Sequence, residues 1–135
     1  MERVHKTLKV AIKLRDGLIC IWCSRTCDLI DRRFEPTLDH LIPLKHGGAS
    51  TWDNLVVACR DCNQCRRSKS VEEFAASRGI DAAEIRRSIR RRTGLSKRKY
   101  MNKARLHLAY HQGRLDAIDE SIRARYEESG GQYEF

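Results

Sequence analysis

Apolar residues recur at helical spacing near the start of the chain. Val4, Leu8 and Ile12 lie on one face of residues 4–15 when these are drawn with a period close to 3.6 residues. Gly17 follows this segment, and glycine readily adopts the left-handed backbone that commonly ends a helix. The pattern therefore predicts a first helix over residues 4–15.

A different pattern occupies residues 20–69. This stretch is dense in Cys, Gly and Asn, and it holds short runs of β-forming residues such as NLVVA at 54–58. We expect a compact unit here, made of a hairpin followed by a helix.

Helical signals return in the second half of the chain. Ser70 with Glu73, and Asp81 with Glu84, each match a capping box, in which the first side chain accepts a hydrogen bond from a free amide of the first turn. Two glycines are natural helix ends, Gly79 and Gly94. The segments together predict an α+β protein with an N-terminal helix, a small ββα core and a helical C-terminal extension.

A seven-residue repeat of apolar side chains runs through the last third of the chain. Its members are Met101, Leu108, Leu115 and Ile122, with Ala104 and Ile118 offset by three. This spacing is typical of a helix that forms an oligomer seam or packs onto its own protein. His111 and Arg125 fall on offset positions and Gly113 interrupts the run, which favours packing onto the protein's own core. A homodimer is the open alternative.

The length of 135 residues suits one domain or one small core with an extension. We expect residues 1–69 to hold the first helix and the core, with the densest motifs at 20–69. Residues 70–135 form the helical extension, either as part of the same compact unit or as an appendage for ligand binding or oligomerisation.

Charge is concentrated in the middle of the chain. The whole sequence carries +9, and residues 60–105 alone hold 15 basic and 5 acidic side chains. Such a block is the electrostatic footprint of a protein that binds a polyanion, with a solvated arginine-rich surface as the alternative. No apolar run reaches the roughly 20 residues that span a bilayer, and the N-terminus lacks an apolar segment with a cleavage site. We therefore expect no membrane partner and a cytoplasmic location.

Four cysteines form two C-x2-C pairs, Cys20 with Cys23 and Cys59 with Cys62. Thiols stay reduced in the cytoplasm, where paired knuckles of this kind hold zinc more often than they form disulfides. We predict one structural Zn²⁺ bound by all four. Two further cysteines, Cys27 and Cys65, are interpreted as buried small hydrophobes.

The residues between and after the knuckles carry a resemblance. DHLIPLKHGG at 39–48 is followed by WDNL at 52–55 and by an Asn directly after the last knuckle cysteine. This arrangement resembles the HNH endonuclease family, whose fold is the ββα-metal finger. The family's three letters match His40, Asn54 and Asn63, and Asp39 matches the acidic residue before the first His. The resemblance covers residues 20–69.

The resemblance implies a role for each of these residues. His40 is the general base, which suits an imidazole whose ordinary pKa is about 6.5. Asp39 and Asn63 supply oxygen ligands for a catalytic Mg²⁺ or Mn²⁺, with other divalent ions open. Asn54 steadies the His40 ring by a hydrogen bond. Because neighbouring residues of a strand point to opposite sides, Asp39 and His40 must lie at a strand end or bend to serve one site. Taken singly, each could instead be a turn or cap residue.

The implied substrate is DNA, held mainly through its backbone. The candidate contacts are basic side chains around the motif and on the following helix, namely Lys45, Arg67, Lys69, Arg66, Arg86, Arg87, Arg90 and Arg91. The function that we predict is a metal-dependent DNA endonuclease that nicks or cuts both strands. A zinc-stabilised DNA-binding module without catalysis, acting within a larger machine, is the alternative, and an RNA-directed protein is a third.

Three further points stay open in the sequence. His46 is a candidate contact to phosphate or metal, whereas His107 and His111 are interpreted as a helix face. Small members of the family occur in bacteriophages and restriction systems, so partner proteins of such systems, and the host cytoplasm for a phage protein, are expectations from the resemblance. The sequence does not indicate which DNA site is recognised or whether one strand or both strands are cut.

Overall fold

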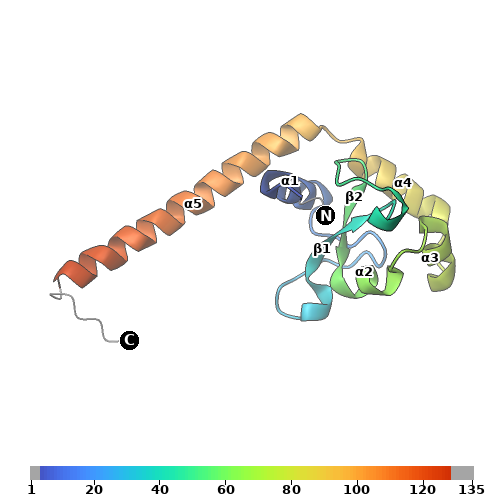
Figure 1. Cartoon of the computed structure of the whole chain (residues 1–135), viewed down its shortest axis with the longest axis horizontal. Coiled ribbons are helices and arrows are strands. Elements are labelled where there is room, and N and C mark those ends of the chain that lie inside the picture. The colour runs from blue at the N-terminus through green and yellow to red at the C-terminus, as the bar shows by residue number, and fades with distance from the viewer. Residues whose placement is uncertain (1–3, 129–135) are drawn as a thin grey trace. The chain divides into compact units, whose positions relative to one another are not determined.

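The computed structural model describes residues 4–128 (Figure 1). In chain order the elements are α1 (Lys6–Asp16), the 3-10 turn η1 (Arg32–Phe34), β1 (Pro36–His40), the 3-10 turn η2 (Leu44–His46), β2 (Leu55–Cys59), α2 (Arg60–Arg66), α3 (Val71–Arg78), α4 (Ala82–Thr93) and α5 (Lys97–Glu128). The predicted α+β class, with a hairpin and a helix between helical ends, is confirmed.

The first helix, α1, begins and ends through local interactions. The ring of His5 accepts a hydrogen bond from the Thr7 amide at its start, and Gly17 ends it in the left-handed region with φ of 62°. Ala11 and Ile12 are buried, and α1 packs against β2. The helix predicted over residues 4–15 is therefore confirmed, with a shift of one or two residues at its ends.

The two strands form an antiparallel hairpin. Pro36 lies opposite Cys59, and His40 opposite Leu55. All five residues of β2 are buried because α1 packs against this strand and α2 also contacts it. On β1, the side chains of Thr37 and Asp39 contact α2, so Leu38 and His40 point to the other side.

An ion pair that the sequence did not predict ties α1 to the hairpin. Arg15 donates to Asp16 at 2.7 Å, to the Trp52 carbonyl at 2.7 Å and to the Leu55 carbonyl at 2.6 Å. Asp16 in turn accepts from the Val57 amide at 2.8 Å. Both side chains are fully buried. The end of α1, predicted only as a helix end, therefore also holds the helix against the hairpin.

Two capped helices, α3 and α4, cover the first knuckle. Ser70 accepts from the Glu73 amide at 3.1 Å, as predicted, whereas Asp81 accepts from the Ala83 amide at 2.9 Å. Phe74 of α3 packs edge-on against the knuckle residue Trp22, with ring centroids 4.9 Å apart.

The glycines that end α3 and α4 do so for different reasons. Gly79 is left-handed, with φ of 66°. Gly94 has an ordinary right-handed backbone, but a Cβ there would lie 2.8 Å from the Arg90 carbonyl oxygen. Close approach, and not the predicted backbone conformation, accounts for the second glycine.

The chain divides into two compact units, residues 1–104 and 105–135. Helices α3 and α4 lie in the first unit together with the hairpin, and so do Met101 and Ala104, which contact its core. The side chains of Leu115, Ile118 and Ile122 lie outside the described residues, so the choice between oligomer seam and self-packing stays a prediction. Nowhere among residues 4–128 is a helix both long and apolar enough to cross a membrane.

Candidate metal centre and nuclease site

The four knuckle cysteines meet at one point. Cys20 and Cys23 lie in the turn between α1 and β1, while Cys59 ends β2 and Cys62 lies in the first turn of α2. Their sulfur atoms all lie within 4.8 Å of one another, and those of Cys23 and Cys59 are 4.0 Å apart. A tetrahedron with Zn–S bonds of about 2.3 Å has edges of about 3.8 Å. The donor set therefore fits a closed zinc site.

The surroundings of this cluster explain why it suits a metal. Burial raises the pKa of Cys20 to about 12 and that of Cys62 above its ordinary value, so these sulfurs are thiols until a cation displaces their protons. Arg78 of α3 lies 3.8 Å from the Cys62 sulfur and offsets part of the thiolate charge. Because Cys59 and Cys62 begin α2, an ion here fixes that helix against the hairpin.

The two remaining cysteines differ. Cys27 is buried, as predicted, and burial raises its pKa to about 11. Cys65 is exposed on α2, so its interpretation as a buried residue is wrong. Although Cys65 follows the buried Cys62 by only three residues, it lies next to the exposed Gln64 on the side of α2 that faces solvent.

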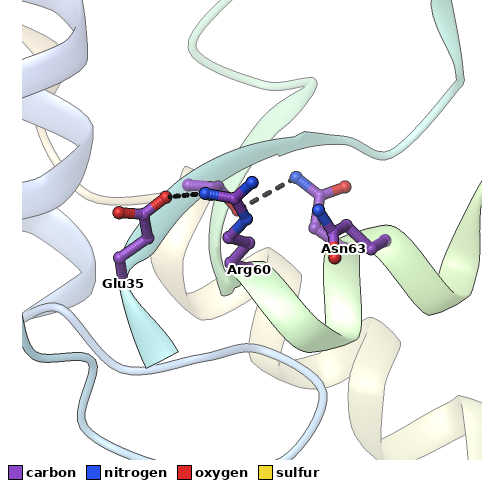
Figure 2. Close-up of a pocket in the computed structure, with 5 residues that line it drawn as sticks. Glu35, Arg60 and Asn63 are labelled. Carbon is purple, nitrogen blue, oxygen red and sulfur yellow. Dashed lines mark hydrogen bonds and ion pairs between the residues drawn. The ribbon is translucent and has the colours of Figure 1, made fainter. Parts of the chain in front are cut away.

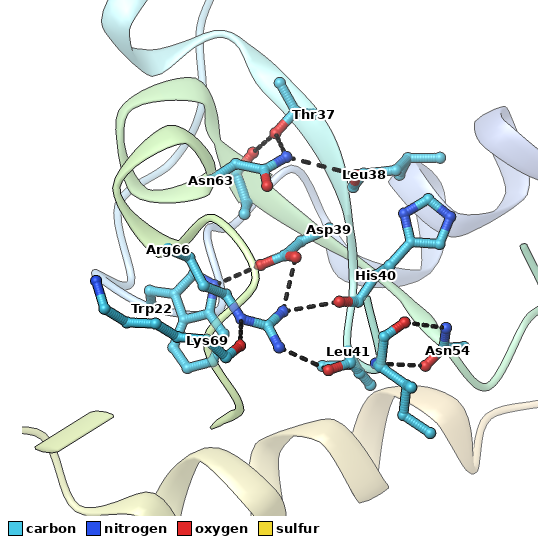
Figure 3. A network of polar contacts seen from close by, with 12 residues as sticks. Trp22, Thr37, Leu38, Asp39, His40, Leu41, Asn54, Asn63, Arg66 and Lys69 are labelled. Carbon is cyan, nitrogen blue, oxygen red and sulfur yellow. Dashed lines mark hydrogen bonds and ion pairs between the residues drawn. The ribbon is translucent and has the colours of Figure 1, made fainter. Parts of the chain in front are cut away.

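Asp39 is buried in an ion pair with Arg66. One carboxylate oxygen accepts from Arg66 at 2.7 Å and the other from the Trp22 indole at 2.8 Å (Figure 3). Burial raises the pKa of the Asp39 carboxyl, while Arg66 and the Trp22 hydrogen bond act in the opposite direction. Only 4% of Asp39 is exposed. Both carboxylate oxygens thus already accept hydrogen bonds from protein side chains.

Arg66 is the basic partner in this ion pair. It is fully buried, and besides Asp39 it donates to the carbonyls of His40, Leu41 and Lys69 at 2.8, 2.6 and 3.1 Å. The bonds to His40 and Leu41 join the last turn of α2 to the end of β1. The burial argues against the predicted role of Arg66 in binding the DNA backbone.

Asn63 of α2 lies on the same side of the hairpin and contacts Thr37, two residues before Asp39 on β1. The Thr37 hydroxyl donates to the Ala58 carbonyl at 2.8 Å, so it must accept from the Asn63 amide nitrogen at 2.9 Å. The Asn63 carbonyl oxygen is therefore the atom turned outward. It borders a cavity of about 330 Å³ whose rim carries the Glu35–Arg60 ion pair at 2.8 Å (Figure 2).

His40 ends β1 on the opposite side from Asp39, as Figure 3 shows. Its ring is half-buried, and Nε2 lies 3.0 Å from the hydroxyl of Ser50. Ser50 was not predicted from the sequence. It stands ten residues from His40, in a loop that returns to the strand, and a serine after GGA carries no signal for such a contact.

Asn54 directly precedes β2, as the resemblance implied, but its amide bonds to the backbone. It accepts from the Ile42 amide at 2.8 Å and donates to the carbonyls of Ile42 at 3.0 Å and Ala49 at 2.8 Å. Gly48 packs so closely under this bracket that a Cβ there would lie 1.7 Å from the Ile42 oxygen. Asn54 thus holds the loop that carries Ser50, and reaches the His40 ring through Ser50.

The predicted oxygen ligands fit a catalytic cation only in part. The outward oxygen of Asn63 is a suitable ligand for Mg²⁺ or Mn²⁺. The Asp39 carboxylate does not fit as it stands, because a buried guanidinium already neutralises it. Within the described part of the chain, the knuckle cysteines are the one group of three or more Cys, His, Asp or Glu side chains close enough to share an ion.

These residues all fall within one stretch that matches a known family. The model described as HNH endonuclease matches residues 20–69. Residues 20–69 are an HNH endonuclease domain. No curated protein and no solved structure matches the chain. The HNH domain thus comprises both knuckles, the hairpin and α2. The matched range is the one over which the sequence resembles the family.

The predicted basic contacts around the HNH domain are unequal. Within this domain, Lys45 on η2 and Arg67 and Lys69 just after α2 are exposed. On α4, Arg86 pairs with Glu72 at 2.9 Å, whereas Arg87, Arg90 and Arg91 are exposed. His46 is also exposed on η2, and the rings of His107 and His111 lie 4.3 Å apart on the exposed surface of α5.

Proposed function

We propose that this protein is a DNA endonuclease in which His40 of the HNH domain is the general base. Membership of residues 20–69 in a nuclease family supports the reaction class. The single observation that carries the role of His40 is its hydrogen bond to Ser50 at the end of β1, because a positioned imidazole is what base catalysis requires.

The proposed step is hydrolysis of one phosphodiester bond. His40 removes a proton from a water molecule, and the water oxygen bonds to phosphorus. The bond from phosphorus to the 3′ oxygen breaks, and that oxygen takes up a proton, which leaves a 3′ hydroxyl and a 5′ phosphate. The hydrogen bond between Ser50 and Nε2 fixes the orientation of the ring that receives the proton.

Two metal ions belong to the proposal. The knuckle cysteines hold a structural Zn²⁺, which fixes α2 and with it Asn63. A divalent cation, Mg²⁺ or Mn²⁺, would stabilise negative charge on the leaving oxygen. The outward Asn63 oxygen is its best-placed ligand, and Asp39 could join only after exchanging its Arg66 partner. The requirement for this second ion is a prediction from the family resemblance.

The ion pair between Asp39 and Arg66 also favours the alternative function, a DNA-binding module without catalysis. A carboxylate withheld from a cation is what such a module would tolerate. Exposed basic groups such as Lys45, Arg67 and Lys69 would serve DNA binding in either case.

A plasmid assay separates the two functions. Purified protein of verified zinc content is incubated with supercoiled plasmid and Mg²⁺, Mn²⁺ or other divalent ions, beside His40→Ala. The proposal expects nicked or linear plasmid with the wild type only. Intact plasmid with every ion, together with retained DNA binding, would leave the non-catalytic module as the function.

A further inference from the structure

A cavity separates the first knuckle from α4. It has a volume of about 340 Å³. Its apolar floor is formed by Ile21, Trp22, Ile80 and Ile85. Its polar wall is formed by Ser24 of the knuckle and by Glu84, Arg87, Ser88 and Arg91 of α4. Of these polar residues only Ser24 lies within the HNH domain, and none of them takes part in the proposed chemistry.

Two arginines face this cavity from one side of α4. Arg87 and Arg91 are four residues apart, so they lie on the same helix face, and like charges at this spacing destabilise a helix by a few tenths of a kcal/mol. Arg91 is held toward the cavity by a hydrogen bond to Ser88 at 3.1 Å. No ion pair within the described residues engages either guanidinium.

Two other arginines of the same helix have acidic partners. Arg86 bonds both oxygens of Glu72, at 2.9 and 3.1 Å, and Arg92 lies 3.2 Å from the buried Asp16 carboxylate. Glu84 lines the cavity but forms no ion pair with the two arginines in the described structure, so the cavity wall carries a net charge of +1. Arg90 also forms no ion pair among the described residues, but it does not line the cavity, so Arg87 and Arg91 are the unpaired arginines available to a ligand there.

We propose that this cavity is a binding site for a phosphate group. Two guanidinium groups with the hydroxyls of Ser24 and Ser88 match the oxygens of a phosphate, which arginine binds through paired hydrogen bonds. The source of that phosphate is the backbone of the DNA substrate, a point that rests on the proposed function. A phosphate held here contacts the duplex between α4 and the first knuckle of the HNH domain, and α4 supplies charges that the ββα unit alone lacks.

The first experiment measures DNA binding with a matched control. Arg87→Gln/Arg91→Gln removes the cavity pair, and Arg86→Gln/Arg90→Gln removes two charges from the same helix outside the cavity. Both are made in the His40→Ala background, and binding to a labelled duplex is followed by fluorescence anisotropy at several salt concentrations. We expect the cavity variant to lose about tenfold more affinity than the control, the size of a lost charge-assisted contact. Equal losses in the two variants would overturn the site.

The second experiment uses inorganic phosphate alone. Arginine side-chain Nε–H signals are followed by NMR during a phosphate titration, with Trp22 fluorescence as a second probe of the cavity. Saturable shifts that disappear in Arg87→Gln/Arg91→Gln, and that a short duplex competes away, support a backbone-phosphate site. Shifts that DNA does not displace assign the cavity to a free phosphate compound and overturn its role in DNA binding. An absence of shifts, combined with equal losses in the anisotropy assay, refutes the site.

These readouts are independent of cleavage. A protein that binds DNA through the cavity but never nicks plasmid would refute the nuclease proposal and leave the phosphate site standing. A protein that nicks plasmid with equal affinity losses in the two double variants would do the reverse.

Discussion

Replacing Asp39 by Asn tests the buried ion pair at the centre of the HNH domain. The change keeps the size of the side chain and one oxygen acceptor, but it removes the negative charge that faces Arg66. Arg66 is fully buried and is held by three carbonyls, so it cannot turn to water without breaking the link between α2 and β1. The variant therefore buries an uncompensated positive charge.

The expected cost follows from this burial. Removing one partner of a buried, hydrogen-bonded ion pair typically costs about 3–5 kcal/mol. We expect a loss near about 3 kcal/mol, because the Asn oxygen can still accept from Arg66 or from the Trp22 indole. Against a total stability of about 5–15 kcal/mol for a typical domain, such a loss moves the whole unfolding curve.

The assay is equilibrium unfolding in urea of the zinc-loaded protein, with Asp53→Asn as the control because Asp53 is exposed nearby. Asp53→Asn should change the free energy of unfolding by no more than about 0.5 kcal/mol. If Asp39→Asn unfolds at the wild-type urea concentration yet loses metal-dependent cleavage, our reasoning is refuted. Asp39 would then be a cation ligand, as the sequence predicted, and its bond to Arg66 would contribute little.

Three further predictions concern the surroundings of the site. Ser50→Ala should slow cleavage because the His40 ring loses the contact that orients it, with unchanged folding and recovery in Ser50→Thr; an unchanged single-turnover rate would exclude Ser50 from positioning His40. Cys59→Ser should abolish zinc binding and folding together, and a folded, zinc-free variant in circular dichroism would contradict the structural role of the cluster. Gly48→Ala should lower stability by about 1–3 kcal/mol through its clash with Ile42, so an unchanged melting temperature would argue against the close approach.

The elements that local chemistry specifies were predictable. The knuckle spacing, the apolar face of α1 and the cap at Ser70 each depend on residues a few positions apart, and each is found in the structure. The hairpin and α2 follow from the same stretch, since the second knuckle begins the helix immediately after β2.

Arg66 was misjudged because basic residues near a nucleic-acid site were assumed to face solvent. A signal was available in the helical period: Arg66 follows Cys62 by four residues and Asn63 by three, so it shares their face toward the hairpin. Arg67 lies one residue further and is exposed. Placing α2 against the strands before assigning its basic residues would have separated the two.

The contacts around His40 could not be predicted because they depend on loop closure. Ser50 contacts the ring only when the loop at 42–49 folds back. The hydrogen bonds of the Asn54 side chain and the lack of a side chain at Gly48 determine the course of this loop. The same holds for Asp16, whose partners Val57 and Arg92 are distant in sequence.

The most direct test of His40 as the general base is the single-turnover rate of DNA cleavage by His40→Ala. The variant is compared with wild type and with His46→Ala, which removes an exposed imidazole from the neighbouring η2. We predict that His40→Ala cleaves at least about a hundredfold more slowly, with unchanged zinc content and DNA affinity, while His46→Ala cleaves like the wild type. Cleavage by His40→Ala at the wild-type rate would contradict the account.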